Sequence, residues 1–365
     1  MADHIHLFVG ALNRKAPYFQ GANGVGLSLF RFDDETGAAE LVSEVGDVDN
    51  PSYLTVDPKR RTLYAVSEVF GWKEGIVTAY RYDLQAGRLD YINMQPALGS
   101  ISCYASLADG DRVLLIANYA MGEGGPDQSV VVLPIRGDGG LLPPVGSVAH
   151  RGTGPNKERQ ERSHAHCALQ VPGTDFVLVA DLGIDQVLVY RLTGEGQLEK
   201  VGSHHAAPGA GPRHIALHPT EPLVFVINEL GSTVSSLRFG MDGSLTEIAT
   251  VSTLPEGATM PNDSSDLQIS PDGRFLYGCN RGHDSVAILS VDATTGALAP
   301  VGHVPCGGST PRNCGLSPSG RHLLVANQNA DVITVFRRNA EDGSLTDTGN
   351  PIRTGTPMCV KFVAG

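Results

Sequence analysis

The chain has 365 residues, 41% of them hydrophobic, and carries 39 Asp and Glu against 27 Lys and Arg. Its net charge of -12 argues against a nucleic-acid groove or an anionic membrane surface, because both partners need a basic protein face. With 44 glycines and 23 prolines spread along the chain, many tight turns are predicted. We therefore expect a globular protein with a small-molecule or protein partner.

The compartment is predicted from leader, membrane and cysteine patterns. No apolar run approaches the roughly 20 residues of a membrane span. The start of the chain carries Asp3, His4 and His6, where a secretory leader has a basic and then an apolar stretch. Six cysteines occur without a C-x-x-C pair, which predicts buried free thiols. We expect a cytoplasmic protein with no membrane partner.

Internal repetition is the main structural signal. Copies that read strand, turn, strand begin at 50 (NPSYLTVDPKRRTLYAVSE), 102, 164, 211, 263 and 310, and none contains a helical pattern. Anchors at residues 51, 103, 165, 212, 264, 311 and 357 give spacings of 52, 62, 47, 52, 47 and 46. Such a period is typical of one four-stranded propeller blade per copy.

The seventh copy is divided between the two ends of the chain. TPMCVKFVAG (356–365) supplies a first strand, and HIHLFVGALN and GLSLFRFDDETG near the start supply the next two. We predict an all-β, seven-bladed β-propeller over 1–365 as a single domain, with one blade closed by joining the N- and C-terminal strands. A monomer or a weak homo-oligomer is expected.

Two local patterns predict features within the blades. The segments Asp33–Gly37, Asp242–Leu245 and Asp342–Leu345 predict hairpins between outer strands, because Asp and Gly suit tight turns. The long spacing of 62 marks the polar insertion RGTGPNKERQERSH, which we expect to hang over one face.

The repeat register predicts which side chains meet at the axis, because the first strand of each blade lines the central channel. The residues after the anchors form one ring: Ser52, Tyr104, His166, Arg213, Ser265, Arg312 and Met358. The ends of the second strands form another: Glu68, Leu182, Glu229, Arg281 and Gln328. Antiparallel pairing of the two strands places both rings at the same mouth.

These rings predict a cluster that binds a small anion, because a guanidinium binds carboxylate or phosphate through two N–H groups. The alternative is a set of Arg–Glu pairs that only tie blades together, above all for Glu68 and Arg312. His164 and His166 alternate and also permit a metal pair, but no third ligand has suitable spacing. We expect no metal and no cofactor.

Several motifs carry a family resemblance over essentially the whole chain. GAGPRHIALHP, VINELGSTV, SPDGRFLYGCNRGHDSVAI, TPRNCGLSPSGRHLLVANQ and HAHCALQ resemble the seven-bladed propeller lactonase family. That family includes propeller-type 6-phosphogluconolactonases and is similar to the carboxy-cis,cis-muconate lactonizing enzymes. The resemblance implies a metal-independent site at the mouth, whose functional residues match His166, Arg213, Glu229 and Arg281.

The resemblance also predicts residues around the substrate. The insertion resembles the family's loop at that blade, which implies substrate contacts from Asn156, Lys157, Arg159 and Gln160. One departure is Ser102-Cys103-Tyr104 where many relatives read Pro-Cys-His, so that Tyr104 is expected to replace a histidine at the mouth. The predicted substrate-binding set is Glu68, Tyr104, Arg159, His164, Arg312 and Gln328.

Three hypotheses remain open. The first is an aldonolactone hydrolase acting on 6-phosphogluconolactone or a related lactone, with Glu229 or His166 as base and Arg213 and Arg281 as oxyanion or substrate ligands. The second is a lactonizing enzyme, in which arginines clamp a tricarboxylate. Tyr104, Asn118, Asn280, Asn327 and Gln328 near the rings favour the sugar. The third hypothesis is a non-catalytic propeller that binds a partner.

Overall fold

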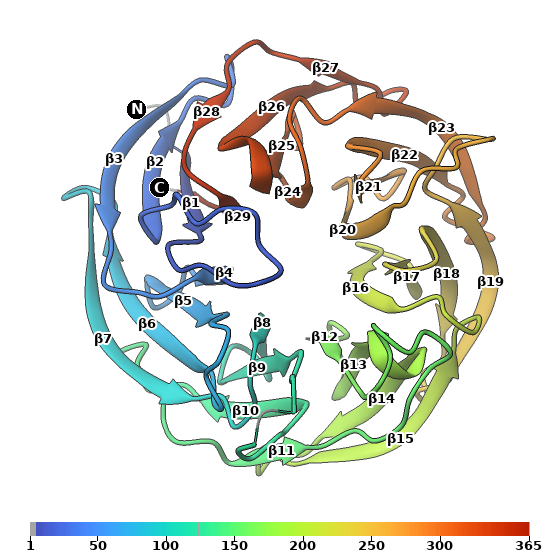
Figure 1. Ribbon diagram of the computed structural model, residues 1–365, viewed down its shortest axis with the longest axis horizontal. Coiled ribbons are helices and arrows are strands. Elements are labelled where there is room, and N and C mark those ends of the chain that lie inside the picture. The colour runs from blue at the N-terminus through green and yellow to red at the C-terminus, as the bar shows by residue number, and fades with distance from the viewer. Residues whose placement is uncertain (1–4, 123, 365) are drawn as a thin grey trace.

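The computed structural model describes residues 5–122 and 124–364, which form seven sheets around an axis (Figure 1). Residues 1–4, on which part of the leader argument rests, lie outside the described residues. The sheets are all antiparallel, and two 3-10 turns, η1 (Leu182–Ile184) and η2 (Gln328–Ala330), follow second strands. Within the described ranges, we find no helix long and apolar enough to span a membrane.

Apart from β29, which is red, the strands of the first four sheets follow the chain from blue to green in Figure 1. The closing sheet has the order β29 (Pro357–Ala364), β1 (Ile5–Ala11), β2 (Leu27–Phe32) and β3 (Ala39–Val45). The second contains β4 (Pro51–Asp57), β5 (Thr62–Ser67), β6 (Ile76–Asp83) and β7 (Arg88–Pro96). The third contains β8 (Ser102–Ala108), β9 (Val113–Asn118), β10 (Val130–Pro134) and β11 (Gly146–Val148). The fourth contains β12 (Ala165–Gln170), β13 (Phe176–Asp181), β14 (Gln186–Leu192) and β15 (Leu198–His205).

The remaining three sheets complete the ring. The fifth contains β16 (Pro212–Leu217), β17 (Leu223–Asn228), β18 (Thr233–Phe239) and β19 (Leu245–Ser252). The sixth contains β20 (Asp263–Ile269), β21 (Phe275–Arg281), β22 (Ser285–Val291) and β23 (Leu298–Pro305). The seventh contains β24 (Pro311–Leu316), β25 (His322–Asn327), β26 (Val332–Arg338) and β27 (Leu345–Asp347), and a short fifth strand, β28 (Ile352–Arg353), pairs with β26.

The predicted fold and its closure are confirmed. β29 pairs antiparallel with β1 from Ile5↔Ala364 to Ala11↔Pro357, so the last strand of the chain is the innermost strand of the blade that the first strands build. The predicted hairpins also occur, between β2 and β3, between β18 and β19, and between β26 and β27. Closure joins the first and last strands of the chain in one blade and so completes the ring.

The hairpin glycines explain how neighbouring blades fit. Gly343 has φ +75°, and a Cβ there would lie 2.4 Å from Cδ1 of Phe275 in the preceding blade. In the same hairpin, the Gly343 carbonyl accepts a hydrogen bond of 3.0 Å from the Tyr277 hydroxyl. Gly343, directly after Asp342, therefore gives both a tight turn and an interblade contact that only glycine permits.

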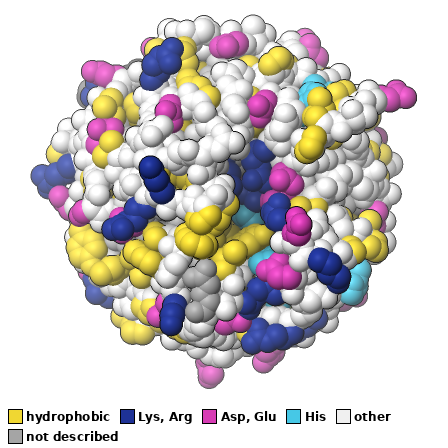
Figure 2. All heavy atoms as spheres, viewed as in Figure 1, with side chains coloured by type: hydrophobic (Ala, Val, Ile, Leu, Met, Phe, Trp, Pro, Cys, Tyr) yellow, Lys and Arg dark blue, Asp and Glu magenta, His cyan; other side chains and the backbone are white. Residues whose placement is uncertain are grey.

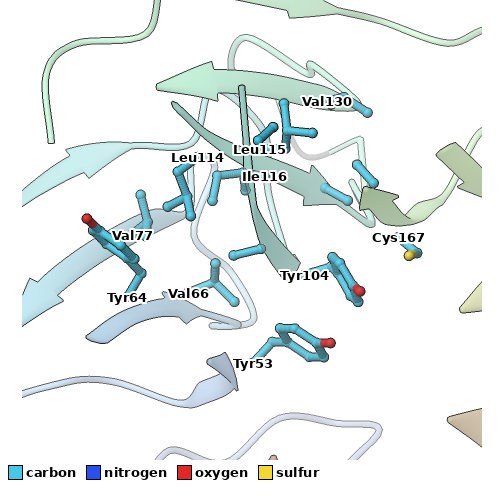
Figure 3. Packing of buried hydrophobic residues seen from close by; sticks show 14 of the residues in the cluster. Tyr53, Tyr64, Val66, Val77, Tyr104, Leu114, Leu115, Ile116, Val130 and Cys167 are labelled. Carbon is cyan, nitrogen blue, oxygen red and sulfur yellow. The ribbon is translucent and has the colours of Figure 1, made fainter. Parts of the chain in front are cut away.

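The core lies between blades, where sheet faces pack on one another. Figure 3 shows Tyr64, Val66 and Val77 of one blade against Leu114 and Ile116 of the next. All six cysteines are free and buried in these layers, which confirms their predicted state. Such packing holds the first strands rigidly around the axis and so positions whatever their ends present at the mouth.

A β-bulge recurs at one position of every first strand. The register shift lies between Ala165 and Cys167 in β12, between Pro212 and His214 in β16, and between Pro311 and Asn313 in β24. The strands β4, β8, β20 and β29 have corresponding shifts. A bulged residue is unpaired and its side chain is re-aimed, so the repeat supplies at least one such side chain per blade near the axis.

Candidate active site

A pocket of about 380 Å³ opens at one end of the axis. Its lining residues come from both predicted rings and from the loops above them: Tyr18, Glu68, Ile101, Cys103, Tyr119, Met121, Glu158, Arg159, Glu161, His164, His166, Arg213, Glu229, Asp263, Arg281 and Arg312. Its size is that of a small-molecule site. Three residues of each predicted ring line this mouth: His166, Arg213 and Arg312 of the first, and Glu68, Glu229 and Arg281 of the second.

Most of the predicted site residues meet in this pocket. The four candidates for catalysis line it, and so do four of the six candidates for substrate binding: His166, Arg213, Glu229, Arg281, Glu68, Arg159, His164 and Arg312. Tyr104 and Gln328 do not. The structure thus places eight of these ten side chains together, and their roles stay predictions.

Glu229, directly after β17, is the centre of the charged cluster. Its side chain is 1% exposed, and it accepts hydrogen bonds from two guanidiniums, Arg159 at Oε1 and Arg213 at Oε2. A third guanidinium, that of Arg281 at the end of β21, places Nη2 3.1 Å from Oε2. The two carboxylate oxygens therefore hold three arginines from three different segments in one arrangement.

The charges in this cluster shift its pKa values. Burial by itself raises the pKa of Glu229, but the surrounding guanidiniums, Arg281 foremost, outweigh burial and hold that pKa well below its usual range. Burial lowers the pKa of Arg281 to about 10, with Glu229 opposing and Arg213 adding to the shift. At neutral pH Glu229 is therefore an anion and Arg281 is still a cation.

The pocket is not a net cationic site, which corrects the sequence-based expectation. Its lining has four guanidiniums and five carboxylates. Arg312 pairs with Glu68 at 3.5 Å, and Arg159 lies 3.6 Å from Asp263 in addition to Glu229. Each arginine is fixed by a carboxylate, because four buried or half-buried positive charges without partners are too costly to keep together.

His166 is the bulged residue of β12 and is 3% exposed. Burial and then the charge of Arg213 hold its pKa well below the ordinary 6.5, so the imidazole is neutral at neutral pH. Its Nδ1 lies 3.7 Å from Sγ of Cys103. Burial and the nearby Glu68 raise the pKa of the Cys103 thiol, which argues against a thiolate nucleophile beside His166.

Tyr104 lies below the pocket, so its predicted position at the mouth is wrong. The bulge of β8 falls between Ser102 and Tyr104, which makes Cys103 the ring residue of this blade. The Tyr104 ring instead stacks on Tyr53 at 4.2 Å between centroids, as Figure 3 shows. The predicted anchor of this copy lies one residue too late. A shift of one residue turns a strand's side chains to the other face, so Tyr104 was selected in place of Cys103.

Gln328 and three asparagines also lie away from the pocket. Gln328 begins η2, is buried and donates to Asn329 Oδ1 at 3.1 Å. The Asn118, Asn280 and Asn327 side chains donate to the backbone carbonyls of Ala97, Thr253 and Cys306 at 2.7, 2.7 and 3.1 Å. These hydrogen bonds link the ends of second strands to the loops between blades. The expected sugar-binding role of these amides at the mouth therefore has no geometric basis.

The insertion before β12 covers part of the mouth, as predicted, but contributes fewer contacts than the resemblance implies. Arg159 reaches Glu229, and its neighbours Glu158 and Glu161 line the pocket. Gln160 is buried and donates to Leu182 O and Asp185 Oδ1. Lys157 is exposed and donates to Gly154 O. The buried amide therefore anchors the segment that carries Arg159.

His164 is fixed by contacts with its surroundings. Its Nδ1 is 2.8 Å from Tyr119 O, its Nε2 is 3.2 Å from Glu161 Oε2, and its ring stacks on Tyr119 at 4.0 Å. Among the described residues, no group of three or more His, Cys, Asp or Glu side chains is arranged to hold a metal ion. These contacts make His164 a support for the pocket wall formed by Tyr119.

Sequence reasoning missed several lining residues. Tyr119 follows Asn118 as Glu229 follows Asn228, so a complete second ring would have included it. Tyr18, Ile101 and Met121 lie in loops, where the repeat gives no register. Burial raises the pKa of Tyr119 to about 12, so its phenol is neutral at the pocket wall.

The mouth consequently has two unlike sides. The charged side consists of Arg213, Glu229, Arg281 and Arg312, from the blades that begin with β16, β20 and β24. The apolar side consists of Tyr18, Ile101, Tyr119 and Met121, from the loops after β1, β7 and β9. Figure 2 shows the central hollow with charged side chains on one border and a hydrophobic patch on the other.

Below the pocket, a buried network supports His166. The ring of His214 lies 5.1 Å from that of His166, and its Nδ1 is 2.7 Å from Asp266 Oδ1. Oδ2 of Asp266 accepts from the Asn313 side chain at 2.5 Å and from Cys314 N at 3.0 Å. Burial lowers the pKa of His214, with Asp266 opposing. The layer under His166 thus contains the neutral imidazole of His214, which the carboxylate of Asp266 holds in place.

Fold and pocket together define a seven-bladed propeller with an axial small-molecule site. A sequence model of the family described as "Lactonase, 7-bladed beta-propeller" matches residues 6–362. The chain belongs to this family.

Named relatives agree with this assignment. The chain is 38% identical over 289 residues to a 6-phosphogluconolactonase of Bacillus subtilis, which covers 79% of this chain and 80% of the relative. It is 32% identical over 313 residues to a 6-phosphogluconolactonase of Formosa agariphila, covering 84% and 85%. The structure of a periplasmic gluconolactonase of Pseudomonas aeruginosa superposes with a TM-score of 0.90 at 32% identity, covering 99% of both chains.

Proposed function

We propose that the protein hydrolyses an aldonolactone, with 6-phosphogluconolactone as the leading substrate. The observation that carries the proposal is the neutral His166 beside Glu229 and its three arginines in one axial pocket. The names of the similar proteins support the substrate class. Lactone opening needs a base for water and cations for the developing oxyanion, and this pocket contains both.

In the proposed reaction, His166 is the general base. It accepts a proton from water as the water oxygen bonds to the lactone carbonyl carbon, and the carbonyl electron pair moves onto oxygen. The tetrahedral intermediate then expels the ring oxygen, which takes the proton back from the imidazolium. Glu229 serves this role poorly, because its pKa is well below the usual range and both its oxygens already accept hydrogen bonds from guanidiniums.

The arginines are proposed to stabilise the oxyanion through N–H groups that Glu229 leaves available. Arg213 and Arg281 lie on the same carboxylate oxygen, so their cationic groups converge at one place in the pocket. A tricarboxylate substrate needs most of the arginines at once, and each one here is already paired with a carboxylate. The lactonizing alternative therefore has less support than hydrolysis.

We further propose that the protein acts in the cytoplasm as a monomer, without metal or cofactor, on a free metabolite. Six free buried cysteines suit a reducing compartment. Light scattering on a sizing column tests the monomer, and a second mass equal to two chains overturns it.

The central test is proton release near neutral pH on freshly prepared 6-phosphoglucono-δ-lactone, glucono-δ-lactone and carboxymuconolactone, with a chelator present and the spontaneous rate subtracted. The proposal expects catalysed opening of at least one sugar lactone that the chelator does not reduce. Turnover of the muconolactone alone supports the lactonizing enzyme, and absence of turnover on all three overturns the hydrolase.

A further inference from the structure

An aromatic cluster borders the pocket on its apolar side. Tyr18, Phe19 and Phe70 come from the loops after β1 and β5, and we call them the aromatic platform. Tyr18 packs edge to face on Phe19 at 4.5 Å and on Phe70 at 5.9 Å between ring centroids. Figure 1 shows the loop after β1 reaching toward the axis.

The loop that carries Tyr18 is anchored at its base. Asn50 Oδ1 accepts from the backbone amides of Asn13 and Arg14 at 3.0 and 2.7 Å, and Gly24 N donates to Leu12 O at 2.7 Å. These bonds close the loop on itself and on the next blade. The ends of the loop that carries Tyr18 are therefore fixed before any ligand binds, which reduces the entropy lost on binding.

The platform remains exposed although it is aromatic. Tyr18 is 45% exposed and Phe70 is 41% exposed, and Tyr18 also lines the axial pocket. Aromatic surface that is left in water beside a polar pocket is typical of a ligand-binding surface. The continuity with the pocket identifies the occupant as part of the molecule that the pocket binds.

The third ring connects the platform to the charged side. The guanidinium of Arg312 lies 5.6 Å from the centroid of Phe19, and it also pairs with Glu68 at 3.5 Å. A ligand between the two sides therefore meets aromatic rings on one side and guanidiniums on the other.

We propose that the aromatic platform packs against the C–H face of the sugar ring while the charged side holds its carbonyl, so that the protein recognises the carbon skeleton of an aldonolactone. An aldose ring presents C–H groups on its faces and hydroxyls at its edge, which complements such a two-sided mouth. This inference rests on the proposed function for the identity of the ring.

The test uses Tyr18→Ala, Phe70→Ala and the double variant, with glucono-δ-lactone as substrate and gluconate as a non-reacting ligand. Gluconate binding is followed by the fluorescence of Trp72, the single tryptophan of the chain, which lies two residues after Phe70. Each substitution is expected to raise KM and the gluconate Kd about fivefold, with kcat changed less than about twofold. The matched control is Tyr91→Ala, which removes a ring on β7 that is 54% exposed and packs edge to face on Tyr80.

The outcomes separate this inference from the proposed function. If the wild type hydrolyses gluconolactone and the variants keep its KM and Kd, the platform is wrong. If the wild type opens no lactone, but the variants bind gluconate more weakly than the wild type does, the proposed activity fails and the platform stands. If the wild type neither opens lactones nor binds gluconate, both are overturned.

Discussion

The two sides of the axial mouth are built by different parts of the fold. On the charged side, Arg213 is a strand bulge, and Glu229 and Arg281 lie at strand ends, so their positions follow the propeller's repeat. On the apolar side, Tyr18 and Met121 lie in loops between strands. The comparison teaches that the groups we propose to react are fixed by the packed scaffold, while the side chains we propose to recognise the substrate's shape lie on loops that can vary without disturbing it.

The largest effect is expected from breaking the charged side at Glu229→Gln. The change leaves three guanidiniums without their common anion, so the free energy of unfolding falls by about 3–5 kcal/mol. Loss of their alignment lowers kcat by about a hundredfold or more. Chemical denaturation and lactone turnover measure both. The control Glu40→Gln removes an exposed carboxylate that pairs with Arg31 at 3.2 Å. It should change the free energy of unfolding by no more than about 0.5 kcal/mol and leave kcat unchanged. Retention of full activity in Glu229→Gln argues that the cluster only ties blades together.

His166→Ala comes next, because it removes the proposed base without removing a charge. We expect kcat to fall by about a hundredfold to ten-thousandfold while the protein remains folded. His205→Ala, at the exposed end of β15, is the matched control and should retain wild-type kcat. If His166→Ala turns over at the wild-type rate, another group activates the water.

The lowered pKa of His166 also predicts how kcat/KM changes with pH. A base must be neutral to act, and burial together with the charge of Arg213 holds the pKa of His166 well below 6.5. Wild-type kcat/KM should therefore stay level as pH falls through 6.5 and decline only at lower pH. Initial rates between about pH 5 and 8, corrected for spontaneous opening, test this. A midpoint at or above 6.5 contradicts the depressed pKa.

Arg312→Gln tests the residue that connects the two sides. It removes the contact with Phe19 and the pair with Glu68, and KM is expected to rise about tenfold with a smaller change in kcat. Arg337→Gln, an exposed arginine on β26, serves as the control. A loss confined to kcat assigns Arg312 to the reacting atoms and not to binding.

The smallest effect is expected for Tyr119→Phe on the apolar side. The ring and its stacking on His164 are retained, and only a neutral hydroxyl is lost. We expect kcat/KM to fall by about threefold or less, with an unchanged melting temperature. A loss as large as that of His166→Ala shows that the hydroxyl acts on the substrate, and the apolar side then shares in the chemistry.

The repeat explains why so much of the site was predictable. Six of the seven residues that alignment placed in the first ring occupy bulge positions, because each copy forms the same strand and the same bulge. The prediction for Tyr104 was wrong because the anchor of its copy lay one residue too late. Side chains alternate along a strand, so that shift selected Tyr104, which faces away from the pocket. The sugar-binding role predicted for Asn280 and Asn327 was wrong because a sequence position near a ring does not determine whether the side-chain amide faces the pocket or a backbone carbonyl.

The amino-acid sequence by itself determined the seven blades, the joining of the chain ends in one blade, and the set of His166, Arg213, Glu229 and Arg281 at one mouth. These features follow from periodic patterns, which sequence displays directly. Only the tertiary structure decided that Glu229 gathers three arginines, that each cation is paired, and that loop residues such as Tyr18 form the opposite side. Distances, burial and loop paths arise from contacts between segments far apart in the chain, and no local pattern encodes them.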